Sequence, residues 1–133
     1  GGVVWFSLDN PGQSPRVPVF CGVKDFPALF DICGNHRYRD DAALWHYREA
    51  NKLAAVKWGA FRQIMEKNIM YFEEKGQREL PFVEAQYQQI LKEKGEDAAR
   101  DFLTGYTGDF FGATIMRWDE MAREYWIQSR FGL

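Results

Sequence analysis

The stretch VVWFSLDNPGQSPRVPVFCGV, residues 3–23, decides the fold class of this chain. Its first part, residues 3–8, is rich in β-branched and aromatic side chains, which favour a strand. Residues 9–15 contain the Asn, Pro, Gly and Ser side chains that are typical of tight turns. Residues 17–23 have the composition of a second strand, in which Pro18 lacks a backbone donor and belongs at a strand end or a sheet edge. The stretch therefore predicts two strands joined by a loop.

The connection that follows, residues 24–40, has no regular apolar period and predicts an irregular segment with one helical turn near Ala28. Beyond it, apolar side chains recur every three or four residues, which is the period of a helix with one buried face. The residues of this seam are Ala43, Tyr47, Ala50, Ala54, Trp58, Phe61, Met65, Ile69 and Phe72. The period therefore predicts one continuous helix after the two strands.

The limits of this first helix follow from its end signals. Asp40 or Asp41 supplies a carboxylate cap at its start, and Gly76 follows Lys75 as a stop. The helix would span about 35 residues, or roughly 50 Å at 1.5 Å per residue. Gly59 inside it costs about 1 kcal/mol relative to alanine, so we expect a bend or close packing at that point.

Two further helices are predicted in the rest of the chain. Pro81 suits the first turn of a second helix, which ends at Gly95. The acidic residues 96–97 suit the start of a third helix, whose interior contains three glycines between positions 105 and 112. Either this helix breaks near Thr107, or the glycines let another backbone come close. We expect close approach, because the aromatic period continues on both sides.

The fold class that follows is α+β and mostly α: an N-terminal two-stranded β segment followed by three helices. Residues 1–40 form the strand–loop–strand and the irregular connection, and residues 41–133 form the three-helix segment. A two-stranded sheet is marginally stable alone. We therefore interpret the chain as a fragment of a larger protein whose other strands are missing here.

The composition excludes some classes of function. The chain has 133 residues, the length of one domain, and a formal net charge of −2 without a basic block, so nucleic acid is not an expected partner. No apolar run approaches the roughly 20 residues of a membrane span, and the sequence makes no prediction about compartment. Aromatic residues make up 17% of the chain, which favours an aromatic core over a ligand-stacking surface.

Candidate catalytic side chains are few. Cys21 lies in an apolar strand, and we expect it and Cys33 both to be free and buried, with a disulfide between them as the alternative. His46 has the sequence context of a partly exposed helix residue, with a catalytic role as the alternative. Cys33 and His36 have too few neighbouring ligands for a zinc site, so no metal and no cofactor is predicted. The residues alone predict no complete catalytic group.

Three segments, in order, resemble a known family. They are residues 3–23, quoted above; YRDDAALWHYREANKL, which begins at Tyr38; and DFLTGYTGDFFGATIMRWDEMAREYW, which begins at Asp101. Together they resemble the C-terminal portion of the cysteine dipeptidases of the dipeptidase A type, which belong to the N-terminal-nucleophile hydrolase superfamily. The resemblance covers nearly the whole chain.

The resemblance implies a four-layer αββα fold and hydrolysis of dipeptides by an N-terminal cysteine, whose own α-amino group serves as base. That cysteine would lie upstream of Gly1, so no catalytic residue is expected within this chain, and the fragment alone would be inactive. The expected partners are dipeptide substrates bound by the full-length chain, the upstream part of the same polypeptide, and a second copy in a homo-oligomer. The alternative is a helical protein-interaction or oligomerisation module.

The loop between the two strands supplies the substrate-binding candidates, because loops at strand ends often carry sites. These candidates are Ser14, Arg16 and Phe20.

Overall fold

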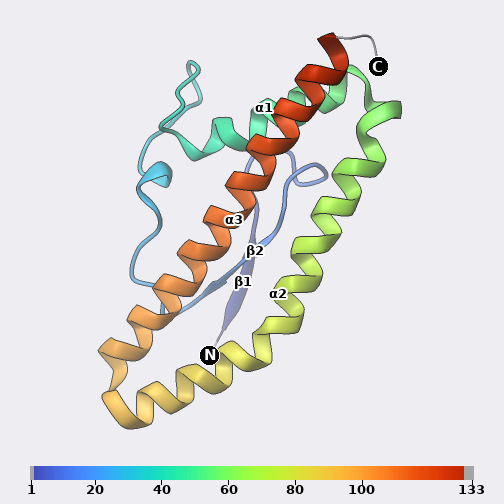
Figure 1. Cartoon of the computed structure of the whole chain (residues 1–133). Coiled ribbons are helices and arrows are strands. Elements are labelled where there is room, and N and C mark those ends of the chain that lie inside the picture. The colour runs from blue at the N-terminus through green and yellow to red at the C-terminus, as the bar shows by residue number, and fades with distance from the viewer. Residues whose placement is uncertain (1, 131–133) are drawn as a thin grey trace.

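The structure, a computed structural model, describes residues 2–130 and contains two strands and three long helices (Figure 1). In chain order the elements are β1 (Val3–Phe6), β2 (Val17–Phe20), the 3-10 turn η1 (Ala28–Phe30), α1 (Ala43–Val56), α2 (Trp58–Lys94) and α3 (Glu96–Arg130). The prediction of a mostly helical α+β chain, with a two-stranded β segment followed by three helices, is confirmed.

The two strands form an antiparallel pair in which Val3 lies opposite Phe20 and Phe6 lies opposite Val17. Each strand has four residues, so both are shorter than predicted. Among residues 2–130 the sheet contains no third strand, and each strand therefore has one unpaired edge. Pro18 lies in β2, opposite Trp5. Proline has no backbone N–H, and this costs no hydrogen bond on the edge of β2 where no further strand pairs.

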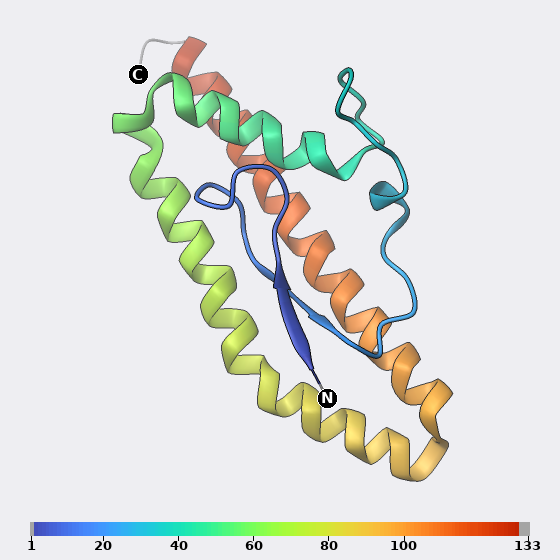
Figure 2. The ribbon, with the colours of Figure 1, turned by 180° about the vertical axis from the view of Figure 1, so that it is seen from behind.

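Helix α3 is the central element of the molecule. It contacts α1, α2 and β2, and it runs alongside α2 as the second arm of a long helical hairpin. Figure 2 shows the two strands lying against this hairpin, with α1 crossing near the ends where α3 finishes and α2 begins. The side chain of Thr107 fixes β2 to α3 by donating a hydrogen bond to the carbonyl oxygen of Pro18 over 3.3 Å.

The first predicted helix is not continuous. It breaks at Lys57, whose backbone (φ −130°, ψ 57°) separates α1 from α2. The chain turns there because both arms of the apolar seam pack against α3, which one straight helix could not achieve. The bend expected at Gly59 therefore lies two residues earlier. The predicted carboxylate caps were also wrong: Ala42 occupies the N-cap, and Asp41 pairs with Arg39 instead, at 2.7 Å.

Helix α2 does not stop at Gly76, and Pro81 does not begin a new helix. Both residues lie inside α2, which bends near Pro81 (Figures 1 and 2). Proline removes one helical hydrogen bond and clashes with the preceding turn, so a bend at this position is its normal effect. Gly76 is needed for close packing instead: a Cβ placed on it would lie 2.7 Å from Cζ3 of Trp5.

The end of α2 was predicted correctly. Gly95 has a φ of 94°, a left-handed conformation that favours glycine, and it alone separates α2 from α3. Helix α3 continues through Thr107 without a break. The close approach expected at its glycines was wrong, because a Cβ added to Gly105 or Gly112 would meet nothing within 4 Å.

An aromatic core joins all parts of the described chain, and it draws on both residues 1–40 and residues 41–133. Phe61 stacks on Tyr125 with ring centroids 4.4 Å apart, and Trp118 meets the ring of Tyr47 edge-on at 6.3 Å. The largest fully buried side chains of this core are Trp118, Tyr47, Tyr125, Phe61, Phe111, Met65, Met121 and Val17. The aromatic content of the sequence is therefore used mainly for packing.

Candidate functional site

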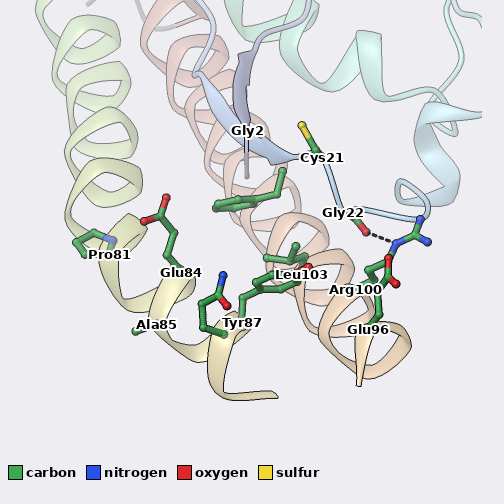
Figure 3. A pocket seen from close by; sticks show the side chains of 12 residues that line it. Gly2, Cys21, Gly22, Pro81, Glu84, Ala85, Tyr87, Glu96, Arg100 and Leu103 are labelled. Carbon is green, nitrogen blue, oxygen red and sulfur yellow. Dashed lines mark hydrogen bonds between the residues drawn. The ribbon is translucent and has the colours of Figure 1, made fainter. Parts of the chain in front are cut away.

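One large cavity, of about 620 Å³, lies between the end of β2, the C-terminal part of α2 and the first turns of α3 (Figure 3). A cavity of this volume is in the range of small-molecule sites. The residues that line it are Gly2, Phe20, Cys21, Gly22, Pro81, Glu84, Ala85, Tyr87, Gln88, Glu96, Arg100 and Leu103. The bend of α2 at Pro81 creates this space, because it brings the end of the helix across the start of α3 (Figure 1).

Phe20 is the one substrate-binding candidate in this cavity. Its side chain is buried, and its ring meets that of Tyr106 edge-on at a centroid distance of 6.0 Å. Cys21 follows it at the rim and is exposed, as is Cys33 in the irregular connection, so the prediction that both cysteines are buried was wrong. The strand ends at Phe20, and Cys21 belongs to the turn beyond it. The prediction that Cys21 and Cys33 are both free is confirmed.

The charged groups of the cavity come mainly from the two helices. The Nε of Arg100 donates a hydrogen bond to the carbonyl oxygen of Gly22 over 3.1 Å, as Figure 3 shows. Glu84 of α2 and Glu96 of α3 place two carboxylates in the same lining. The cavity lining therefore combines the apolar side chains of Phe20 and Leu103 with both cationic and anionic groups, which suits the binding of a small polar molecule. It places no histidine beside Cys21, so it does not form a nucleophile–base pair.

Ser14 lies inside the molecule. Its side chain is fully buried, and its Oγ accepts a hydrogen bond from Nδ2 of Asn51 over 2.9 Å. The Oδ1 of Asn51 accepts from Nε1 of Trp118 over 3.2 Å, and the same indole nitrogen lies 3.2 Å from the carbonyl oxygen of Gln13. These contacts attach the loop between the strands to α1 and α3, and they give Ser14 a structural position.

Asp9 completes this buried polar cluster. Its backbone is left-handed, with a φ of 64°, and its carboxylate accepts hydrogen bonds from Arg48 and Asn51 over 2.9 and 3.0 Å. Burial raises the pKa of Asp9, but the hydrogen bonds from Asn51 and Arg48 outweigh it and hold the pKa below the ordinary value of 3.8. Sequence reasoning missed Asp9 and Asn51; the turn composition of residues 9–15 was a signal for Asp9, and no local signal pointed to Asn51.

Arg16 lies on the surface, outside both the large cavity and the polar cluster. Its guanidinium is 3.4 Å from the carboxylate of Glu73 on α2, and both groups are substantially exposed. Arg16, Trp5, Glu73 and Gln77 line a shallower hollow of about 410 Å³. The three predicted binding residues therefore do not meet in one site: Ser14 is buried in the polar cluster, Arg16 pairs with α2, and Phe20 lines the large cavity.

His46 of α1 has partners that the sequence did not indicate. Its Nδ1 lies 2.9 Å from a carboxylate oxygen of Asp119 on α3, and its Nε2 lies 2.7 Å from the carbonyl oxygen of Asp40. Both ring nitrogens are thus engaged, which leaves no free nitrogen to activate a nucleophile. The expectation of a partly exposed helix residue agrees with its 20% exposed side chain.

Within residues 2–130, no three His, Cys, Asp or Glu side chains gather in a way that could hold a metal ion. In the same part of the chain, no helix combines the length and the apolar character that crossing a membrane requires.

Comparisons with protein-family models, with curated proteins and with solved structures each find no match to this chain.

Proposed function

We propose that this chain is the C-terminal part of a cysteine dipeptidase with an N-terminal-nucleophile hydrolase fold. In this proposal the nucleophile is a cysteine upstream of Gly1, and its thiol attacks the dipeptide carbonyl to form an acyl-enzyme that water then hydrolyses. The described residues supply structure to the enzyme, and their two strands extend a larger sheet. The proposal rests on the order of the three sequence segments that resemble the family and on one feature of the sheet.

That feature is the incomplete sheet, and it is the main structural observation in favour of the proposal. One face of β1 is open, with Val4 61% and Phe6 41% exposed, although both side chains are apolar and suit a sheet interior. Both strands also have an unpaired edge within the described chain. Exposed apolar edge strands promote pairing with other chains, and proteins usually cover or charge them. Further strands from the same polypeptide would cover this face and pair with these edges.

The positions of the possible nucleophiles support an upstream catalytic residue. Cys21 is exposed at the rim of the large cavity, and none of the histidines lines that cavity. His46 already has partners on both ring nitrogens. A cysteine nucleophile is activated by a neighbouring base or positive charge. The cation that lines this cavity, Arg100, donates its Nε to the carbonyl oxygen of Gly22. An N-terminal cysteine would not need these side chains, because its own α-amino group can serve as base.

The experiment compares the 133-residue chain with a longer polypeptide that includes the residues upstream of Gly1. Each is incubated with a panel of dipeptides, and the released amino acids are measured by chromatography. We expect no turnover by the short chain and clear turnover by the long one. Replacing the N-terminal cysteine of the long polypeptide with alanine should abolish activity, whereas Cys21→Ala should leave it unchanged. Turnover by the short chain that Cys21→Ala abolishes would contradict the proposal.

A second candidate function is a helical interaction module that binds a second copy of the chain. The observation in its favour is the set of large apolar side chains exposed on the helices: Val56, Met70, Tyr71, Phe82, Met116, Trp126 and Ile127. Phe82 is the most exposed aromatic of this set, at 73%. Light scattering over a range of concentrations tests this function. A dimer would support it, whereas a monomer at high concentration that binds no dye for apolar surface would count against it.

A further inference from the structure

The side chain of His46 links three elements of the chain: α1, α3 and the irregular segment that precedes α1. It projects from the first turns of α1, and Asp119 lies on α3, 73 residues away. Asp40 belongs to the irregular segment that precedes α1, and its carbonyl oxygen lies on the other side of the ring. The imidazole is 20% exposed and the Asp119 carboxylate 35% exposed, so the contact is shielded from solvent but can still exchange protons with it.

The two partners of the ring can only accept hydrogen bonds. Nδ1 lies 2.9 and 3.0 Å from the two carboxylate oxygens of Asp119, and Nε2 lies 2.7 Å from the carbonyl oxygen of Asp40. A neutral imidazole has one N–H and one lone pair, whereas the imidazolium ion has two N–H donors. Only the charged form satisfies both contacts. Either neutral tautomer would direct a nitrogen lone pair at an oxygen.

The charged groups around the ring also favour the imidazolium ion. Asp119 faces it from α3, Glu49 lies one turn away on α1, and Tyr38 of the preceding segment interacts with the same acidic groups. The nearby Arg48 is paired with Asp9 at 2.9 Å and Arg39 with Asp41 at 2.7 Å, so both cations have acidic partners of their own. The surroundings of His46 therefore carry a net negative charge.

We propose that His46 is a pH-dependent clasp, which as imidazolium holds the segment before α1 and the start of α1 against α3, and which loosens when the ring loses its proton. The segment has its own attachment to α1, because Trp45 Nε1 donates a hydrogen bond to the carbonyl oxygen of Gly34 over 2.6 Å. The change is therefore local: the core around Trp118 stays folded while the contact between Asp40, His46 and Asp119 opens.

The direction of the pH dependence follows from linkage. Burial opposes the charge on His46, but the hydrogen bonds to Asp119 and Asp40 favour it more strongly, so the pKa of His46 lies above its ordinary value of 6.5. The stabilisation is complete below about pH 6.5, where the ring is charged in the unfolded chain as well, and it is lost as the pH rises through the folded pKa. The clasp is closed in mild acid and opens on the alkaline side.

The experiment uses the 133-residue chain and two measurements. NMR titration follows the imidazole protons of His46 in the folded chain and, as the reference, in the same chain unfolded in urea. Hydrogen exchange then gives the protection of the amides of residues 40–46 at about pH 5.5 and about pH 8.5, corrected for the intrinsic rates. We expect His46 to titrate at a higher pH in the folded chain than in the unfolded chain, and protection of these amides to fall several-fold at the higher pH.

Variants separate the clasp from general effects of pH. His46→Gln should remove the pH dependence of protection, and the matched variant His36→Gln should retain it. Asp119→Asn should lower the pH at which His46 titrates. If His46 titrates in the folded chain at or below the pH at which it titrates in the unfolded chain, or if wild type and His46→Gln lose protection equally, the proposal is overturned. Should His46→Gln fail to fold, the wild-type titration in the folded and unfolded chain still decides the question.

Discussion

At the scale of single residues, Asn51 has the most connected side chain of the described molecule's interior. It donates to Asp9 and Ser14 and accepts from Trp118, so one amide holds the strand-joining loop, α1 and α3 together. Buried polar groups are costly when they lose their partners, and each unsatisfied group costs about 1–3 kcal/mol. The cluster therefore specifies one position of the loop.

Replacing this amide gives the first prediction. Asn51→Ala leaves the Ser14 hydroxyl and the Trp118 indole without a partner that they now use, and we expect it to lower the free energy of unfolding by about 2–4 kcal/mol. Urea unfolding followed by tryptophan fluorescence measures the change. The control is Asn10→Ala in the same loop, whose side-chain amide makes solvent-exposed hydrogen bonds to Gln13 and Gly12. Equal effects of the two variants would contradict the prediction.

Asp9 gives the second prediction, on acid stability. Because its pKa is lowered in the folded chain, Asp9 contributes stability above its unfolded pKa of about 3.9, and this contribution is lost as the pH falls through the folded pKa. Asp9→Asn should be less stable than wild type at neutral pH, and the difference should shrink below about pH 4. Urea midpoints at several pH values measure it. A difference that is constant with pH would count against this role for the carboxylate.

The sequence could predict little of this cluster. The turn composition of residues 9–15 locates the loop, but nothing local indicates that Asn51 and Trp118 lie against it, since they are 37 and 105 residues from their loop partners. For the same reason the neighbours of Ser14 in the sequence are typical of a surface turn, although its side chain is buried. Cys21 had the neighbours of a strand interior and lies one residue beyond the strand. Long-range packing decides the surroundings of these residues.

At the scale of elements, α2 and α3 contain glycines that have opposite roles. Gly76 of α2 is buried against the ring of Trp5, and an added Cβ would lie 2.7 and 2.8 Å from two of its carbons. Gly105 of α3 has open space around it. Glycine is a poor helix former relative to alanine at both positions. The third prediction uses this matched pair.

We expect Gly76→Ala to lower the free energy of unfolding by about 1–3 kcal/mol, because the tryptophan ring or the strand must move. Gly105→Ala should raise it by up to about 1 kcal/mol, because helix propensity is the only change. Chemical denaturation of both variants measures these differences, and far-UV circular dichroism checks that the helix content is kept. Stabilisation by Gly76→Ala would mean that β1 does not pack on α2 as described.

The existence of three helices was predictable from their apolar period, but their limits were not. The seam from Ala43 to Phe72 keeps helical spacing through Lys57, so no local signal marks the break that packing on α3 imposes. The stop signal at Gly76 and the start signal at Pro81 were both misleading, because packing against Trp5 and a bend explain these two residues instead. Gly95 was predictable because its positive φ is a local requirement.

At the scale of the whole molecule, the open face of the sheet is the feature that most needs a partner. The fourth prediction changes it in the 133-residue chain. Val4→Thr removes exposed apolar surface, and we expect it to reduce binding of a dye for apolar surface while the free energy of unfolding changes by less than about 0.5 kcal/mol. Phe6→Thr should also reduce dye binding but cost about 0.5–1.5 kcal/mol, because the Phe6 ring meets the buried ring of Phe111 edge-on at 6.3 Å. The control, Phe20→Ala in the same sheet but buried, should cost about 3–5 kcal/mol.

Dye fluorescence and urea unfolding of the three variants measure both effects. If Val4→Thr is as destabilising as Phe20→Ala, the outer face is already covered in the folded chain and the case for missing strands is lost. If dye binding is unchanged, the dye binds another apolar surface, and the exposed helical side chains named for the second candidate function are the expected binding surface.

The fold class and the small sheet could be predicted from residues 3–23 and from the helical period, because both depend on local composition. The large cavity could not, because it depends on the bend at Pro81 and on the contact between the ends of α2 and α3. Among the binding candidates, Phe20 lines the large cavity, and its position at a strand end was the only reason in the sequence to expect this. The same reasoning applied equally to Ser14, which is buried because its partners lie on helices later in the sequence.

The hydrogen bond from Trp118 to the loop carbonyl of Gln13 spans 105 residues, and this separation has a consequence during synthesis on the ribosome. Translation proceeds at about 5–20 residues per second, so the loop is synthesised roughly 5–20 s before the tryptophan that anchors it. In that interval the strands and their loop can contact α1 and α2, through Asn51 and Gly76, but the partner that fixes the loop to α3 has not yet been made. The hairpin therefore reaches its final position only after Trp118, in the second half of α3, has been synthesised.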